Sequence, residues 1–182
     1  MFPRLPRTTG RRQLDADIRE WNLIPLSRHS SLSTMSRVFR FVPSLILVAL
    51  DQFLKRHILA TYPTGTVRPI LGNWMRVSVA RNPGGAFGLF PGHRGLLITV
   101  SGIVVVALLV FLATVKRLSA PYRYGIPLLL AGAAGNLIDR VFLGYVVDYV
   151  EVRGFSVFNL ADACVVVGVF LVAVGLVFGK EP

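Results

Sequence analysis

The side chains best suited to acid–base chemistry gather between residues 136 and 162. Almost all of the acidic and amide groups in the second half of the chain lie there, together with one arginine: Asn136, Asp139, Arg140, Asp148, Glu151, Asn159 and Asp162. Two carboxyl groups held close together at the edge of a hydrocarbon layer cannot both ionise cheaply, because burial and mutual repulsion each favour the protonated form of one of them. Such a pair supplies one acid and one base, as needed to activate water against a peptide carbonyl and to protonate the leaving amine.

The spacing of these residues predicts which of them share a surface. Asn136, Asp139 and Arg140 are spaced i, i+3, i+4 and therefore lie on one face of a helix. Asn159 and Asp162 repeat the i, i+3 spacing where the next apolar segment begins. The alternative is that these groups are interfacial anchors and helix caps, since capping and the helix dipole both favour a carboxylate at a helix N-terminus.

Four apolar blocks must position these groups. They cover about residues 41–60, 96–115, 124–143 and 161–178, and each is long enough to cross ~30 Å of hydrocarbon as a helix. The chain is 53% hydrophobic and 16% charged, which is typical of a membrane protein. The sequence therefore predicts an all-α membrane protein with four transmembrane helices. Basic residues before the first block, between the second and third, and after the fourth predict that both termini are cytoplasmic.

The loops on the other side of the membrane are predicted to form a small β-rich region. Residues 66–70 and 74–79 have strand-like composition, and the second run alternates apolar with polar or small side chains, as in a strand of a small sheet at the membrane surface. A glycine-rich turn follows at residues 82–88. Asp148 lies on the connection between the third and fourth blocks, after Val146 and Val147, which would hold the backbone against the membrane.

Two charged residues inside the first block need an explanation. Asp51 and Lys55 are four residues apart and therefore share a helix face. Charges within a span are costly unless they are paired or face the interior of the bundle. We expect an ion pair that locks the helix in the bundle, and direct contact with the chemistry is the alternative.

The remaining composition narrows the class of protein. The net charge of +11 is not accompanied by an aromatic-interleaved basic patch or a nucleic-acid-binding motif, so no nucleic-acid partner is expected. Residues 1–36 are polar and are predicted to be a disordered cytoplasmic tail ahead of a membrane domain at 37–182, and translation could begin at Met35. Cys164 is expected to be inert, and the histidines match no zinc spacing, so neither a metal nor a cofactor is expected.

Five short motifs carry a resemblance to a known family. In chain order they are residues 51–55 (DQFLK), 82–88 (NPGGAFG), 135–140 (GNLIDR), 146–148 (VVD) and 158–162 (FNLAD). Together they resemble the successive signature blocks of lipoprotein signal peptidase, also called signal peptidase II, in that family's order. One departure is visible: only 13 residues separate Asp148 from Asp162, so the segment that would cover the site, residues 149–157, is short for the family.

The resemblance implies a function and a role for each polar residue. It implies an aspartyl endopeptidase of the bacterial cytoplasmic membrane, with its active site on the extracytoplasmic side, that cuts diacylglyceryl-modified prolipoproteins on the amino side of the lipidated cysteine. The implied catalytic residues are Asp148 and Asp162. The residues implied around the substrate are Asn82, Asn136, Arg140 and Asn159, and those implied to support them are Asp51, Lys55 and Asp139. Membrane lipids are the other expected partners, and no obligate protein partner is expected.

Two other classes of membrane protein are alternatives to a peptidase. A small transporter or proton-coupled carrier also uses membrane-embedded acids, but it should place them near the midplane and often contains internal repeats, whereas these acids cluster at one surface. A non-enzymatic assembly factor would need neither aspartate.

Overall fold

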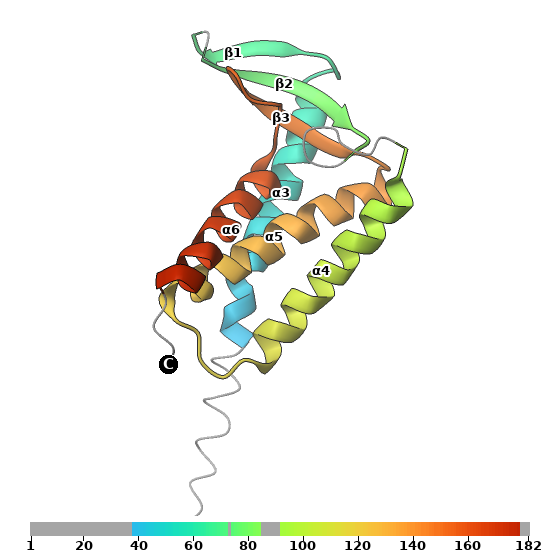
Figure 1. Ribbon diagram of the computed structural model, residues 1–182. Coiled ribbons are helices and arrows are strands. Elements are labelled where there is room, and N and C mark those ends of the chain that lie inside the picture. Colours follow the sequence, from blue (N-terminus) through green and yellow to red (C-terminus); the bar gives the residue numbers. More distant parts are fainter. Residues whose placement is uncertain (1–37, 73, 85–91, 179–182) are drawn as a thin grey trace, which may run out of the picture. The chain divides into compact units, whose positions relative to one another are not determined.

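The computed structural model describes residues 38–72, 74–84 and 92–178. Within these ranges the chain forms one 3₁₀ turn, four long helices and three strands (Figure 1): η1 (Phe39–Phe41), α3 (Val42–Thr61), β1 (Val67–Leu71), β2 (Met75–Asn82), α4 (Arg94–Thr114), α5 (Ala120–Phe142), β3 (Val146–Val152) and α6 (Leu160–Phe178). The predicted N-terminal tail and residues 85–88 of the glycine-rich turn lie outside the described residues.

Each predicted span corresponds to one helix, with ends that shift by a few residues. The largest shift is at α5, which begins at Ala120 and not at residue 124. Pro121 lies in its first turn, where a proline is well tolerated because the backbone N–H that it lacks would have no acceptor within the helix. The polar start of α5 therefore belongs to the helix, although its composition suggested a loop.

Three of the described helices, α4, α5 and α6, are long and apolar enough to cross a membrane. Helix α3 has 20 residues, which is also sufficient length, but Asp51, Lys55 and Arg56 lower its hydropathy. The mostly helical membrane architecture is thus confirmed, and the fourth span remains a prediction.

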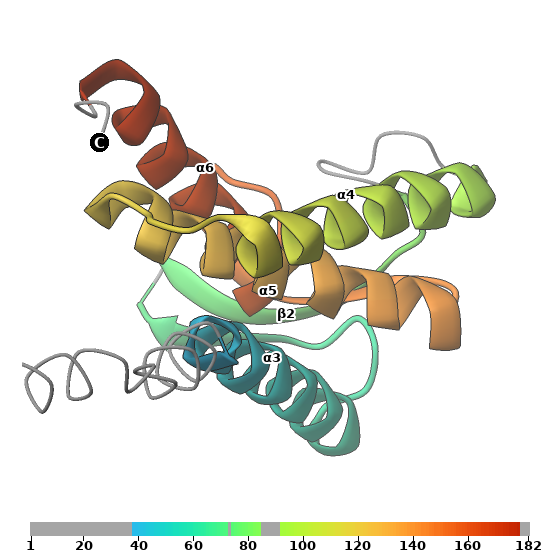
Figure 2. The same ribbon diagram turned by 90° about the horizontal axis from the view of Figure 1, so that it is seen from below.

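Helix α5 lies at the centre of the bundle and packs against the other three helices (Figure 2). Its contact with α6 depends on glycine, because a Cβ atom at Gly132 would lie 2.3 Å from the carbonyl oxygen of Ala161. Gly125 of α5 and Gly168 of α6 meet in the same way about two turns further along. Small residues at this interface let the two backbones approach closely, and this brings the first turn of α6 against α5.

A three-stranded antiparallel sheet in the order β1-β2-β3 lies at the end of the bundle where α5 ends and α6 begins (Figure 1). The two predicted strands correspond to β1 and β2. The sequence pattern does not predict the third strand, β3, because Val146 and Val147 indicate only an apolar anchor. Both are almost fully buried, and their strand pairs with β2 so that Asp148 lies opposite Ala80.

The connection from β3 to α6 is a tight turn with no helix. Phe158 forms an isolated antiparallel bridge with Val150, which closes the turn at residues 153–157, and Gly154 adopts a positive φ of 87° within it. The short segment noted in the sequence therefore folds back on β3 and delivers the chain directly to the start of α6.

We expect Gly132→Ala to destabilise the protein. The added methyl group would collide with the backbone of α6, and overpacking of this kind costs about 1–3 kcal/mol. Gly102→Ala is the matched control, because nothing lies within 4 Å of a Cβ atom there and alanine is the better helix former. Thermal unfolding in detergent should show a lower midpoint for Gly132→Ala alone, and equal midpoints for the two variants would contradict the close packing.

Candidate active site

The first turn of α6 is fixed by a reciprocal pair of side-chain caps. The Asn159 side-chain oxygen accepts a hydrogen bond from the Asp162 backbone N–H at 2.9 Å, and the Asp162 carboxylate accepts one from the Asn159 backbone N–H at 3.3 Å. This is the geometry of a capping box, which satisfies two N–H groups that have no acceptor within the helix. Asp162 therefore caps α6, as the helix-cap alternative from the sequence predicts. Its other carboxylate oxygen can accept a hydrogen bond from another side chain.

Strand β3 holds Asp148 in a buried position beside this turn. Its side chain is 3% exposed. One carboxylate oxygen accepts a hydrogen bond from Asn82 Nδ2 at 3.0 Å, and the other accepts one from Asn159 Nδ2 at 2.8 Å. Asn82 is the last residue of β2, so Asp148 is held by hydrogen bonds from the neighbouring strand and from Asn159, the residue that caps α6.

Asn136 of α5 completes the link between the two aspartates. Its Nδ2 donates to the Asp162 carboxylate at 2.7 Å, and its Oδ1 accepts from Asn159 Nδ2 at 3.2 Å. The two carboxyl groups, on β3 and α6, are therefore joined through the side-chain amides of Asn159 and Asn136. Both amides present an N–H donor to the acids, and such a donor stabilises an ionised carboxylate.

The electrostatic environment makes Asp148 harder to ionise than an ordinary carboxyl group. Burial is the main cause and the negative charge of Asp162 adds to it, so that the pKa of Asp148 is raised to about 6. Hydrogen bonds from Asn82 and Asn159 and the charge of Lys55 act in the opposite direction and offset only part of this rise. Asp148 therefore keeps its proton up to a higher pH than an ordinary carboxyl group does.

Behind the amide bridge, Lys55 lies between two carboxylates. Its Nζ is 2.8 Å from Asp51 Oδ2 and 3.0 Å from Asp139 Oδ2, and all three side chains are almost fully buried. It also donates to Asn136 Oδ1 at 3.1 Å. The expected Asp51–Lys55 pair is therefore part of a larger cluster, with Asp139 as a second anion. This cluster contacts the pair Asp148 and Asp162, called the dyad from here on, through Asn136.

The two carboxylates of this cluster also hold backbone next to each aspartate of the dyad. Asp51 Oδ1 accepts a hydrogen bond from the Ala161 backbone N–H at 3.0 Å, and Asp139 Oδ2 accepts one from the Val147 backbone N–H at 3.1 Å. Ala161 and Val147 immediately precede the two aspartates of the dyad in the sequence. The cluster therefore fixes the positions of both.

Arg140 lies beside the dyad with donor capacity to spare. Its Nη2 donates to the carbonyl oxygen of Gly84 at 3.4 Å, and the charges of Asp162 and Asp148 attract its guanidinium. Its buried Nε–H has no hydrogen-bond partner among the residues that the structure describes. A buried donor of this kind is costly, and a substrate carbonyl could satisfy it.

Sequence reasoning missed two residues that support the site. Gln52 Nε2 donates to Asp139 Oδ1 at 2.9 Å, and the guanidinium of Arg94 donates to the carbonyl oxygens of Arg140 and Val141 at the end of α5, at 2.9 and 3.0 Å. Gln52 lies in the motif at residues 51–55, so the sequence marks its position, but it does not indicate what the Gln52 side chain contacts. Arg94 belongs to none of the five motifs, and its contact depends on how α4 packs against α5.

We expect substitutions in the lysine cluster to lower stability to different extents. Lys55→Met leaves Asp51 and Asp139 buried without a cation, which should cost about 3–5 kcal/mol of unfolding free energy. Asp51→Asn should cost less, because Lys55 keeps Asp139 as a partner. The double variant should recover part of the Lys55→Met loss. Thermal unfolding in detergent measures all three.

Arg56→Met is the matched control for this series, because Arg56 is exposed on the same helix and should behave like the unmodified protein. If Lys55→Met were as stable as Arg56→Met, or if the losses in the double variant were simply additive, the three charges would not form a coupled cluster.

The chain is similar to known proteins over most of its length. The sequence profile of the family described as "Signal peptidase (SPase) II" matches residues 44–178. The lipoprotein signal peptidase of Halothermothrix orenii is 37% identical over 131 residues, which cover 72% of this chain and 90% of that protein. That of Dehalococcoides mccartyi strain 195 is 41% identical over 133 residues, covering 71% and 82%. A bacterial membrane enzyme solved by the in meso method at 2.3 Å resolution matches with a TM-score of 0.72 at 28% identity, over 79% of this chain and 93% of its own. On this similarity the chain belongs to the signal peptidase II family.

Proposed function

We propose that this protein is an aspartyl endopeptidase that removes signal peptides from diacylglyceryl-modified prolipoproteins, cutting on the amino side of the lipidated cysteine. The observation that carries the proposal is the pair of carboxyl groups of Asp148 and Asp162, joined through two amide side chains at the end of a helix bundle. The relatives named lipoprotein signal peptidase support the choice of substrate.

In the proposed mechanism Asp148 holds the proton at rest and Asp162 is the base. Asp148 suits the acid because its pKa is raised to about 6. Asp162 suits the base because its ionised form accepts hydrogen bonds from Asn136 and from the Asn159 backbone and lies in the first turn of α6, where the helix dipole favours a negative charge. Asp162 takes a proton from water as the water attacks the scissile carbonyl, and Asp148 supplies the proton that the leaving amine requires.

Substrate contacts in this proposal come from polar groups around the dyad. The Nε–H of Arg140, which has no hydrogen-bond partner in the described part of the chain, is suited to a peptide carbonyl. Asn82, Asn136 and Asn159 donate hydrogen bonds to the two acids and would therefore lie beside the scissile bond. Acyl chains would lie against the exposed apolar surface of the helices, so specificity depends on lipid as well as on peptide.

We further propose that α3 is the fourth span and that the protein lies in the bacterial cytoplasmic membrane with its active site on the extracytoplasmic side. The charges of α3 support this, because Asp51 and Lys55 face the bundle and satisfy one another, which makes charges tolerable within a span. Four spans leave both termini on one side, and the arginines before α3 favour the cytoplasm for that side. The membrane domain at residues 37–182 is the proposed catalytic unit.

We expect Asp148→Asn and Asp162→Asn each to reduce cleavage of a lipidated prolipoprotein by at least about 10²-fold, because each removes the acid or the base. Both variants should fold. The pKa of Asp148 is higher in the folded protein than its model value of 3.8. Its contribution to folding stability is therefore fully present below about pH 3.8 and is lost as the pH rises through about 6. Asp148→Asn should therefore be at least as thermally stable as the unmodified protein at pH 8.

Glu151→Gln is the matched control, since Glu151 lies on the same strand and pairs with Arg76 away from the dyad. It should retain activity. Substantial turnover by either purified Asp→Asn variant would remove the dyad from the mechanism.

We expect kcat/KM to fall above about pH 6, as Asp148 loses the proton that it must donate. Asn82→Ala should move this alkaline limb to higher pH, because the lost hydrogen bond favours the ionised form of Asp148. Steady-state assays of purified enzyme at pH values on both sides of about 6, the pKa of Asp148, test this. An alkaline limb that is identical in Asn82→Ala would show that Asp148 is not the group it reports.

A further inference from the structure

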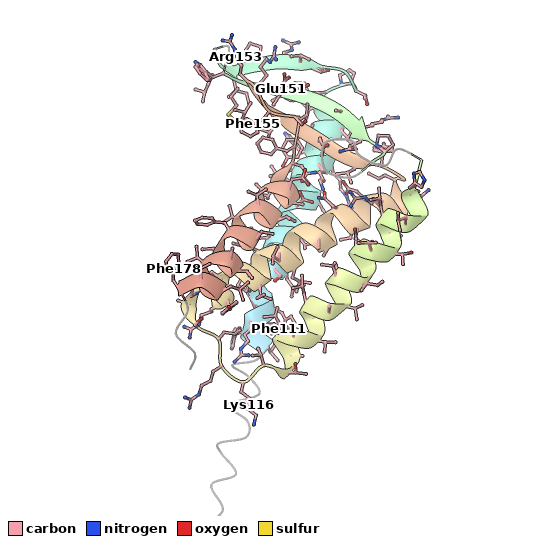
Figure 3. All side chains as sticks on the ribbon, in the orientation of Figure 1. Phe111, Lys116, Glu151, Arg153, Phe155 and Phe178 are labelled. Carbon is pink, nitrogen blue, oxygen red and sulfur yellow. The ribbon has the colours of Figure 1, made fainter. Side chains whose placement is uncertain are left out.

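Four large apolar side chains are exposed at the end of the sheet where the β1–β2 turn meets the turn between β3 and α6. This sheet tip comprises Ile70 and Leu71 of β1, Trp74 after the β1–β2 turn, and Phe155 in the turn between β3 and α6. The two turns are neighbours, because the Arg153 backbone N–H donates to the carbonyl oxygen of Trp74 at 2.9 Å. Figure 3 shows Arg153 and Phe155 at this end of the sheet, far from Lys116 and Phe178 at the opposite end of the bundle.

The sheet tip exposes more apolar surface than an aqueous environment favours. Trp74 is 70% exposed and Phe155 is 72% exposed, and every residue of the edge strand β1 is exposed. Clusters of this kind on a protein surface mark contact with a partner or with a membrane. Tryptophan in particular is enriched at the boundary between lipid and water, where its ring is amphipathic.

The surface next to the sheet tip indicates which partner covers it. The exposed faces of α4 and α6 carry large apolar side chains along the helices, as expected for lipid-facing spans. Helix α6 begins at Leu160, five residues after Phe155. The sheet tip therefore lies at the end of the bundle where the α6 span begins, which is the end at one headgroup layer.

The charges around the sheet tip indicate which lipid it prefers. Residues 67–75 and 153–157 contain two basic residues, Arg68 and Arg153, and no acidic residue. Both arginines are exposed. Apolar anchors beside cations are the combination that binds an interface rich in anionic lipid.

We propose that the sheet tip inserts into the headgroup layer and binds anionic phospholipid, with Trp74 and Phe155 among the upper acyl segments and Arg153 at a lipid phosphate. The anchored strand β3 then holds Asp148 at a fixed depth relative to the bilayer. This contact is separate from the dyad and does not depend on the identity of the substrate.

The tryptophan itself is the reporter for the test. The chain contains two tryptophans, Trp21 and Trp74, so Trp21→Phe leaves Trp74 as the sole fluorophore. The full-length variant is reconstituted into vesicles of mixed phosphatidylglycerol and phosphatidylcholine in which only one of the two lipids carries bromine on its acyl chains. Bromine quenches a tryptophan only when the lipid that carries it is in contact.

We expect Trp74 to be quenched by both brominated lipids, and more strongly when phosphatidylglycerol carries the bromine. One basic residue near the surface contributes about a fivefold preference for anionic lipid, so Arg153→Gln should reduce the preference by about that factor. Arg123→Gln is the control: it removes the same charge from an exposed position in the first turn of α5, at the other end of the bundle, and should leave the preference unchanged.

Three outcomes would overturn the proposal. Emission that is insensitive to bromine on either lipid would place Trp74 in water. Equal quenching by the two lipids, unaffected by Arg153→Gln, would exclude recognition of the anionic headgroup. Quenching that begins only when a lipidated substrate peptide is added would make the sheet tip a substrate contact.

Discussion

The ammonium group of Lys55 is buried between the carboxylates of Asp51 and Asp139, and the geometry of the site depends on this shared cation. Without the cation, Asp51 and Asp139 could not both remain charged away from water. With it, each carboxylate keeps an acceptor free for a backbone N–H, and those N–H groups belong to Ala161 and Val147. One charge on α3 therefore sets the position of a strand and of a helix that are far from it in sequence.

The two aspartates acquire different characters from different kinds of secondary structure. Asp162 stands in the first turn of a helix, where unpaired backbone N–H groups favour a negative charge. Asp148 stands on a strand, which offers no such field, and its carboxylate relies on side-chain amides from Asn82 and Asn159. A symmetric pair would have no preferred acid, whereas in the proposed mechanism the preference comes from the elements that carry the two residues.

The sequence predicted the helices and the polar residues of the site more completely than their contacts. Length and composition were sufficient for the spans because a helix satisfies its own backbone, and the i, i+3 spacing of Asn159 and Asp162 anticipated that they share a face. Strand β3 was missed because its pairing is set by β2, more than sixty residues earlier. The second partner of Lys55 was missed for a similar reason, since local spacing identifies Asp51 but not Asp139 on another helix.

The short connection between β3 and α6 has a consequence for how the protein is made. Asp148 and Asp162 lie close in the sequence, and the bridge between Val150 and Phe158 joins their elements locally. The groups that align them come from α3 and α5, which leave the ribosome earlier, while Asp162 arrives with α6. Chain elongation therefore delivers the last acid only after the residues that align it have been made. The proposed dyad is incomplete until α6 is synthesised, so the protein is not a peptidase during most of its own synthesis.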